Sequence, residues 1–226
     1  PSDNPVVTTV NQCFLKGGVL VPGGPRPRTV EEGVHDLDGV RYVWHDSVAY
    51  VFPEKRRVRL ENGVRTGSWG EISRQYPMDE ISRDVFTLWI DHGIRPSDET
   101  YSYIVAPGLS AETVADYAQS PPVETVVNTK DLQAVRHRYH GIVGAAFYKP
   151  GRIAAGDMTV AVDKPCLVLA HAGDNGCVVS VSNPENEKAS VKVTIECSGK
   201  GRAEVLFDLP GGMNAGMSVT KNVEFR

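Results

Sequence analysis

Apolar and polar residues alternate over many short stretches of this chain. In residues 57–61, Val58 and Leu60 fall on one face and charged side chains on the other, and residues 190–196 repeat the pattern. Successive side chains of a strand point to opposite faces of a sheet, so this alternation predicts half-buried β-strands. Turn signals separate the stretches at a spacing typical of sandwiches. The pattern therefore predicts an all-β chain built from antiparallel β-sandwiches.

Several hairpins are expected from turn residues between strands. Residues 41–44 and 48–52 flank a short turn at His45-Asp46-Ser47. Asp174-Asn175-Gly176 separates residues 167–171 from 177–182, and Asn-Gly tolerates the positive φ of tight hairpins. A third hairpin, around Asn186, would bring Cys177 near Cys197. Residues 203–209 and 218–225 are predicted to continue the series of strands.

One helix is predicted at residues 111–119. Ser110 can cap its N-terminus, and Val114 and Tyr117 then share one face. Pro121-Pro122 ends it, because proline cannot continue a helix.

The segment 119–123 is the predicted domain boundary. We expect a large central β-sandwich domain at residues 1–120, truncated at its start, and a smaller C-terminal β-domain at 121–226. A chain of 226 residues is long enough for two such units. It opens on Pro1-Ser2-Asp3-Asn4-Pro5, without an initiator Met or a secretory apolar segment. We therefore expect a piece of a longer protein.

Composition excludes several kinds of partner. The net charge is −4, from 24 basic and 28 acidic residues. No general field attracts nucleic acid or an anionic membrane, and no run of ~18 apolar residues could span a bilayer. We expect neither nucleic acid nor membrane as a partner. An acidic glycan would need a local basic cluster.

Metal and cofactor sites are not expected. None of Cys13, Cys166, Cys177 and Cys197 stands at a metal-binding spacing. A Cys177–Cys197 disulfide is one alternative, and buried free thiols are the favoured one. His137-x-x-His140 has a possible ligand spacing, but its flanks look like strand and no third ligand is adjacent.

Candidate catalytic residues have simpler structural interpretations. His45 and Asp46 could form an acid–base pair, but neighbouring strand residues point to opposite faces, so turn chemistry is favoured. Asp91-His92-Gly93 follows an apolar strand, and Gly93 with the following Ile94-Arg95-Pro96 indicates a chain reversal. His92 has no visible partner and is expected to be structural. No catalytic residue is predicted.

Two kinds of side chain could contact a glycan. Arg26 and Arg28, in a Pro/Gly loop, could hold a carboxylate or sulfate and are the weak candidates for glycan binding, although a solvated loop is favoured. A second basic run, residues 55–59, is expected to be a solvated stripe. Trp44, Trp69 and Trp89 could stack on sugars, but core packing is the expectation for such large rings, above all for Trp89.

Residues 65–107 resemble the central β-domain of polysaccharide lyase family 8, which includes hyaluronate, chondroitin AC and xanthan lyases. Four pieces occur in the family's order: Gly67-Ser68-Trp69, the strand 85–90, Asp91-His92-Gly93, and the strand 101–107. Residues 8–17 and 42–55 also resemble the family. The order of these pieces, more than any single one, makes the resemblance specific.

The resemblance implies a function in acidic-polysaccharide degradation. Family members cleave uronate-containing glycans by β-elimination, with a tyrosine, an asparagine, a histidine and arginines that sit chiefly on an upstream helical domain. This sequence shows no such helical region. It is therefore expected to be the non-catalytic β-portion of a secreted or periplasmic lyase. Its implied partners are the upstream helical domain and an acidic polysaccharide.

Two other functions remain open from the sequence. The chain could be a free-standing glycan-binding or adhesive module, which continuity of the reading frame with a helical domain would exclude. It could also be a small β-fold enzyme, which would need a convergent acid, base and stabilising group.

Overall fold

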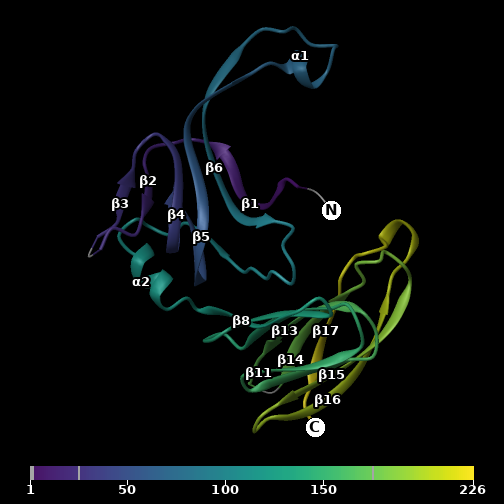
Figure 1. Ribbon diagram of the computed structural model, residues 1–226. Helices are drawn as coiled ribbons and strands as arrows, with labels where there is room; N and C mark the ends of the chain where they lie inside the picture. The colour runs from purple at the N-terminus through teal and green to yellow at the C-terminus, as the bar shows by residue number, and fades with distance from the viewer. Residues whose placement is uncertain (1–2, 25, 175) are drawn as a thin grey trace. The chain divides into compact units, whose positions relative to one another are not determined.

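Antiparallel strands make up most of the protein (Figure 1). The computed structural model describes residues 3–24, 26–174 and 176–226. Contacts divide the chain into two compact units, Pro1–Pro121 and Pro122–Arg226, called unit 1 and unit 2 below. The predicted all-β class is confirmed. Among the described residues, no helix is long and apolar enough to cross a membrane.

Unit 1 is built on one seven-stranded sheet. Its order is β1-β6-β5-β4-β2-β3, and β7 pairs with β5 beyond the end of β6. The strands are β1 (Pro5–Phe14), β2 (Val19–Val21), β3 (Arg28–Val30), β4 (Gly33–His45), β5 (Val48–Gly67), β6 (Ile81–Ile94) and β7 (Ile104–Pro107). Two short helices accompany them, α1 (Trp69–Ile72) and α2 (Val114–Gln119).

Both faces of this sheet are buried near its centre. Alternation along β5 sends Val58 and Leu60 into one cluster, where they meet Phe86 and Leu88 of β6, and all four are 0% exposed. Upstream in β5, Ala49 and Val51 belong to a second cluster, which helix α2 covers. The predicted β4–β5 hairpin is confirmed, with His45 opposite Val48.

Helix α2 begins later than predicted. Residues 110–113 form a turn in which the Ser110 carbonyl accepts from the amides of Thr113 and Val114. The helix itself begins at Val114, and its start has no side-chain cap, so the prediction that Ser110 caps it is wrong. Val114 is buried and Tyr117 packs against the same cluster, as the shared face predicts.

Strand β6 also runs further than predicted. It continues through Asp91-His92-Gly93 to Ile94, where it pairs with β1 across a register shift. The turn predicted at Asp91-His92-Gly93 is therefore wrong, and the strand ends at Ile94, ahead of the Arg95-Pro96 that the predicted reversal also included. Gly93 does adopt a φ of +75°, and its amide donates to Asp91 Oδ1 at 2.8 Å. Pairing with β1 keeps the strand in the sheet past this local kink.

Unit 2 is a sandwich of two sheets. The six-stranded sheet has the order β17-β14-β13-β10-β9-β8, and the four-stranded sheet has the order β11-β12-β15-β16. The strands are β8 (Val123–Asn128), β9 (Leu132–His137), β10 (Ile142–Phe147), β11 (Gly151–Ala155), β12 (Met158–Val162), β13 (Cys166–Ala172), β14 (Gly176–Ser182), β15 (Ala189–Cys197), β16 (Gly201–Leu209) and β17 (Val219–Glu224), with a 3-10 turn at Gly212–Asn214.

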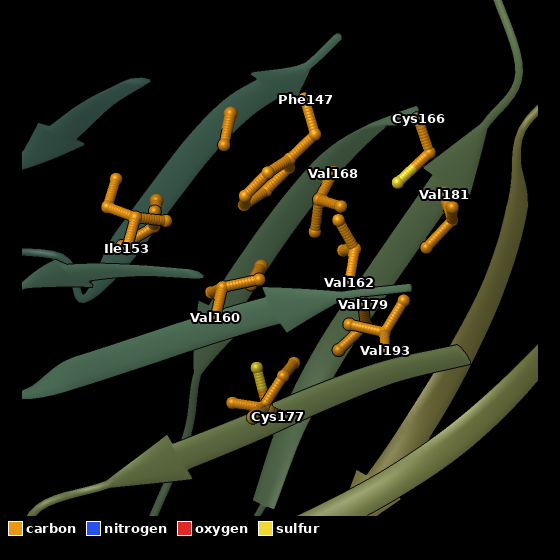
Figure 2. Close-up of a cluster of buried hydrophobic side chains, with 14 of the residues drawn as sticks. Phe147, Ile153, Val160, Val162, Cys166, Val168, Cys177, Val179, Val181 and Val193 are labelled. Atoms are coloured by element: carbon orange, nitrogen blue, oxygen red, sulfur yellow. The ribbon is translucent and has the colours of Figure 1, made fainter. Parts of the chain in front are cut away.

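The core of unit 2 lies between its two sheets. Figure 2 shows Val168 and Val179 of the six-stranded sheet directed toward Val160 and Val193 of the other, and none of the four is more than 4% exposed. Each strand contributes every second residue, as the alternation predicts. The predicted β13–β14 pairing is confirmed, while Asn175 of its turn lies outside the described residues.

The predicted hairpin around Asn186 is wrong. Strands β14 and β15 belong to different sheets, so the intervening segment carries the chain across the sandwich. Asn183 holds this crossing, because its side chain accepts from the Glu185 amide at 3.0 Å and donates to the Glu187 carbonyl at 3.0 Å.

The cysteines are free thiols. Cys166, Cys177 and Cys197 are buried in the core of unit 2, which confirms the favoured interpretation, and Cys13 is partly buried in unit 1. Burial raises the pKa of Cys166 to about 12 and that of Cys177 to about 11.

Candidate functional site

His45 and Asp46 do not form an acid–base pair. Asp46 sits in the β4–β5 turn at a φ of +48°, and its carboxylate lies 3.5 Å from the Lys16 ammonium. His45 points the other way and is only 1% exposed, with its ring stacked on Phe86 at a centroid distance of 4.5 Å. This divergence is the one expected for neighbouring residues at a strand end.

A buried polar cluster surrounds His45. The Lys16 amide donates to His45 Nε2 at 3.0 Å, so the ring proton sits on Nδ1, 3.7 Å from Cys13 Sγ. Asn11 donates to the Tyr50 hydroxyl beside it. Burial lowers the pKa of His45, and protonation would also remove the acceptor that the Lys16 amide needs. The cluster therefore holds β1 to the β4–β5 hairpin around a neutral imidazole.

His92 has partners that the sequence did not reveal. Its Nε2 lies 2.8 Å from Thr8 Oγ1, and its ring lies 5.4 Å from that of Tyr101. These contacts connect β6 to β1 and to the segment before β7. They support the structural interpretation of His92.

His137 is the last residue of β9 and His140 lies in the turn that follows it in unit 2, with ring centroids 4.3 Å apart. The flanking residues are strands, as expected. Within the described part of the chain, no group of three His, Cys, Asp or Glu side chains could hold a metal ion.

Arg26 and Arg28 lie in and beside the β2–β3 connection, and both are exposed. Figure 1 places this connection far from α1. Their contact with an acidic glycan stays a prediction. The expectation of a solvated stripe at residues 55–59 holds for Arg57, which is exposed, but Arg59 is only partly exposed and its Nε is buried. The two arginines form salt bridges to Asp38 and Asp36 at 3.4 and 3.9 Å.

Two of the three tryptophans are only partly buried. Trp44 donates from Nε1 to the Leu109 carbonyl at 2.7 Å and packs against the α2 cluster. Trp89 is not in the core, contrary to prediction, because it occupies the opposite face of β6 from Leu88 and Ile90. The Arg59 guanidinium covers its ring at 5.9 Å from the centroid.

Trp69 is the tryptophan whose exposure differs most from the predicted core packing. It is 58% exposed, where core packing was predicted. It belongs to α1, at the far end of the long β5–β6 hairpin (Figure 1). Other large apolar side chains are exposed with it: Val64 at 59%, Ile72 at 77%, Tyr76 at 58% and Met78 at 68%. Such a group marks a binding surface more often than scattered exposed residues do.

The exposure follows from strand pairing. The β4–β5 pairing extends only to Asn62 of β5, and the β1–β6 pairing only to Val85 of β6. In the described strand pairings, residues 64–67 and 81–84 are therefore opposite each other alone, although the Asp84 carbonyl also accepts from the Leu15 amide at 2.9 Å. Among the described residues of unit 1, no third strand pairs with this two-stranded extension.

The loop that closes this extension, residues 68–80 (the tip loop), is held by internal hydrogen bonds. The Gly70 amide donates to the Pro77 carbonyl at 3.0 Å, and the Ser68 hydroxyl donates to the same carbonyl at 3.2 Å. Gly70 is buried, and a Cβ there would lie 2.4 Å from Met78 Sδ. Gly70 therefore permits close closure of the loop, which turns the neighbouring Trp69 outward.

A hollow lies against this exposed tryptophan. It has a volume of about 260 Å³ and is mostly apolar, and it is lined by Gly67, Ser68, Trp69, Glu71, Ile72 and Ile81. The Tyr76 ring lies 6.4 Å from the Trp69 ring, tilted by 51°, and supports the indole from beside the hollow. An ordered aromatic face beside a carboxylate can bind a flat amphipathic ligand.

The sequence did not predict this site. Gly67-Ser68-Trp69 contributes to the sequence prediction only as one piece of an ordered series of family motifs. The available signal was the cluster of Gly, Ser, Pro and charged residues around Trp69, because a tryptophan in a loop has fewer neighbours to cover it than one in a strand.

Comparison with known proteins agrees with this architecture. The model for the polysaccharide lyase family 8 super-sandwich domain matches residues 1–118, and that for the family's C-terminal β-sandwich domain matches 124–192. The chain belongs to polysaccharide lyase family 8. Chondroitinase-AC of Pedobacter heparinus is 32% identical over 95% of this chain, and a hyaluronate lyase of Thermasporomyces composti is 38% identical over 64%.

Solved structures of lyases carry the same fold. A chondroitinase AC lyase studied as oligosaccharide complexes superimposes with a TM-score of 0.85 and 30% identity over 97% of this chain. A Streptomyces coelicolor chondroitin AC lyase shows the fold at a TM-score of 0.73 and 22% identity. The family 8 chain spans about a third of the lengths of these lyases, 33% and 30% respectively.

Proposed function

We propose that this chain is the non-catalytic β-portion of a lyase that cleaves uronate-containing polysaccharides by β-elimination. One observation carries the proposal: 95% of this chain aligns with chondroitinase-AC, yet it corresponds to only 31% of that protein. The candidate acid–base residues support the same view, because His45 is sealed in a polar cluster and His92 is engaged by Thr8.

The proposed role is support of a catalytic domain elsewhere in the same protein. β-Elimination needs a base for the C5 proton, an acid for the leaving oxygen and groups that neutralise the uronate carboxylate. The described side chains show no such set converging on one hollow. The hollow at the tip loop has Glu71 as its one ionisable lining residue. The proposal places the parent outside the cell or in the periplasm, with an acidic glycan as substrate.

The test is an assay of this chain with hyaluronan, chondroitin and xanthan. β-Elimination produces an unsaturated uronate that absorbs ultraviolet light. We expect no increase in absorbance from the chain, while a complete chondroitinase AC run in parallel gives a steady rise. Activity that follows the protein peak through repurification would overturn the proposal.

The source reading frame provides a second check. An upstream helical region continuous with this sequence is expected. A stop codon and an independent start immediately upstream would favour the free-standing glycan-binding module instead.

A further inference from the structure

The hollow at the tip loop joins an exposed indole to a single carboxylate. We infer that it binds one uncharged N-acetylhexosamine ring of the glycan, with the ring stacked on Trp69 and its acetamido N–H directed to Glu71. The inference deepens the proposed function and rests on it. It adds a subsite and the kind of sugar unit that the subsite accepts.

Size restricts the occupant to a single sugar unit. The hollow of about 260 Å³ lies just below the range of ~300–1,000 Å³ that drug-sized ligands fill. One pyranose ring with its acetamido group fits such a space, whereas several rings do not. The hollow is open to solvent, so the rest of a chain could continue from either end of the bound unit.

The aromatic face favours a carbohydrate. A pyranose presents C–H groups on one side and hydroxyls around its edge, so it needs a flat apolar surface bordered by polar groups. Trp69 supplies that surface, since it is 58% exposed and supported by Tyr76. The short helix and the buried Gly70 hold the backbone that carries the indole before any ligand arrives, which limits the entropy that the loop loses on binding.

Charge favours the uncharged unit over the uronate. The tip loop carries Glu71, Asp79 and Glu80 against one base, Arg74, a net charge of −2 (1 − 3). A uronate carboxylate or a sulfate in the hollow would face Glu71 without a lining cation. Hyaluronan and chondroitin alternate a uronate with an N-acetylhexosamine, so the second unit is the one that this site suits.

The hydrogen bonds within the tip loop indicate that Glu71 is the residue that accepts from the acetamido N–H of the ligand. The Ser68 hydroxyl donates its one proton to the Pro77 carbonyl and accepts from the Gly70 amide, each at 3.2 Å, so it has no proton left to donate to a ligand. Among the lining side chains, the Glu71 carboxylate is the charged acceptor that a ligand can meet. A carboxylate that accepts an amide N–H makes a charge-assisted hydrogen bond, stronger than a neutral one.

The experiment titrates an uncharged N-acetylglucosamine tetramer into the isotope-labelled chain and follows the amide signals of residues 67–81 by NMR. We expect saturable shifts confined to this segment and a millimolar Kd that is independent of salt. Trp69→Ala should weaken binding about tenfold, and Trp69→Phe should recover most of the loss, because the flat face is retained.

Matched controls separate the site from general surface binding. Tyr139→Ala removes an aromatic ring that is 72% exposed in unit 2 and should leave the Kd unchanged. Glu71→Ala should weaken binding of the tetramer, whereas Glu71→Gln retains an acceptor oxygen and should lose less. With an anionic hyaluronan tetrasaccharide, Glu71→Gln should tighten binding by up to about fivefold, since one repulsive surface charge is removed.

Three outcomes would overturn the inference. They are no saturable shift at roughly 10 mM tetramer, equal affinity in the wild type and Trp69→Ala, and salt-sensitive binding of the hyaluronan fragment alone. None of them bears on the elimination assay, so the proposed function would stand. Unchanged unfolding midpoints for the variants would show that lost binding reflects the site and not a lost fold.

Discussion

The two ends of the β5–β6 hairpin show the same alternation of side chains, but their large apolar side chains are buried at one end and exposed at the other. At its base, Leu60, Phe86 and Leu88 are 0% exposed, whereas at its tip Val64 and Trp69 are 59% and 58% exposed. The base is flanked by β4 and β1, whereas no other described strand of unit 1 pairs with the tip. Burial in this sheet is therefore decided by the neighbouring strands more than by the residue type.

The largest effect on the free energy of unfolding is expected for truncation of a buried side chain at the base of the hairpin. Phe86→Ala should lower the free energy of unfolding of unit 1 by about 4 kcal/mol, because it removes a buried ring and leaves a cavity beside His45. Trp69→Ala should change it by less than about 0.5 kcal/mol. All three tryptophans lie in unit 1, so their fluorescence in urea follows that unit. Similar costs for the two variants would refute the contrast.

A smaller and local effect is expected at the tip loop. Gly70→Ala places a methyl group against Met78 Sδ and the Pro77 carbonyl, which should cost about 1–3 kcal/mol of local stability. Faster hydrogen exchange at the amides of residues 70–76 should reveal it, with the exchange of β5 residues 58–62 unchanged. Gly67→Ala, where no atom lies within 4 Å of the new Cβ, is the matched control. Equal exchange in both variants would argue against a tightly closed loop.

The mildest effect concerns pH. Burial lowers the pKa of His45 in the folded state below the ~6.5 of the unfolded chain. Below pH ~6.5 the unfolded state then binds more protons, so the stability of unit 1 should fall with decreasing pH by at most about 1.4 kcal/mol per pH unit. Unfolding of the wild type between pH 7.5 and 5 measures this loss.

Two variants test whether His45 causes the pH dependence of stability. His45→Gln should flatten the dependence, although the variant is less stable throughout. His140→Gln, at an exposed position in unit 2, should retain the wild-type slope. A slope that is unchanged in His45→Gln would show that another group titrates.

Much of the fold followed from local pattern. The strands around Val58 and Val193 were predictable because alternation by itself fixes which face each residue takes. The β4–β5 turn was predictable because the two-residue turn needs the positive φ that Asp46 adopts. The family was predictable because its motifs keep their order along the chain.

Pairing between distant segments was not predictable in this way. Strands β14 and β15 are adjacent in sequence, yet the side chain of Asn183 helps carry the chain from one sheet to the other. Trp89 lies in a strongly apolar stretch, but its position on the strand puts it on the half-exposed face under Arg59.

The sequence by itself determined the β class and membership of a lyase family. Only the tertiary structure decided which of the apolar side chains are exposed to solvent. Trp69 is exposed because β4 and β1 end before the tip, and the lengths of those strands are set by pairings far along the chain. A local pattern specifies which face a side chain takes, but not whether another layer covers that face.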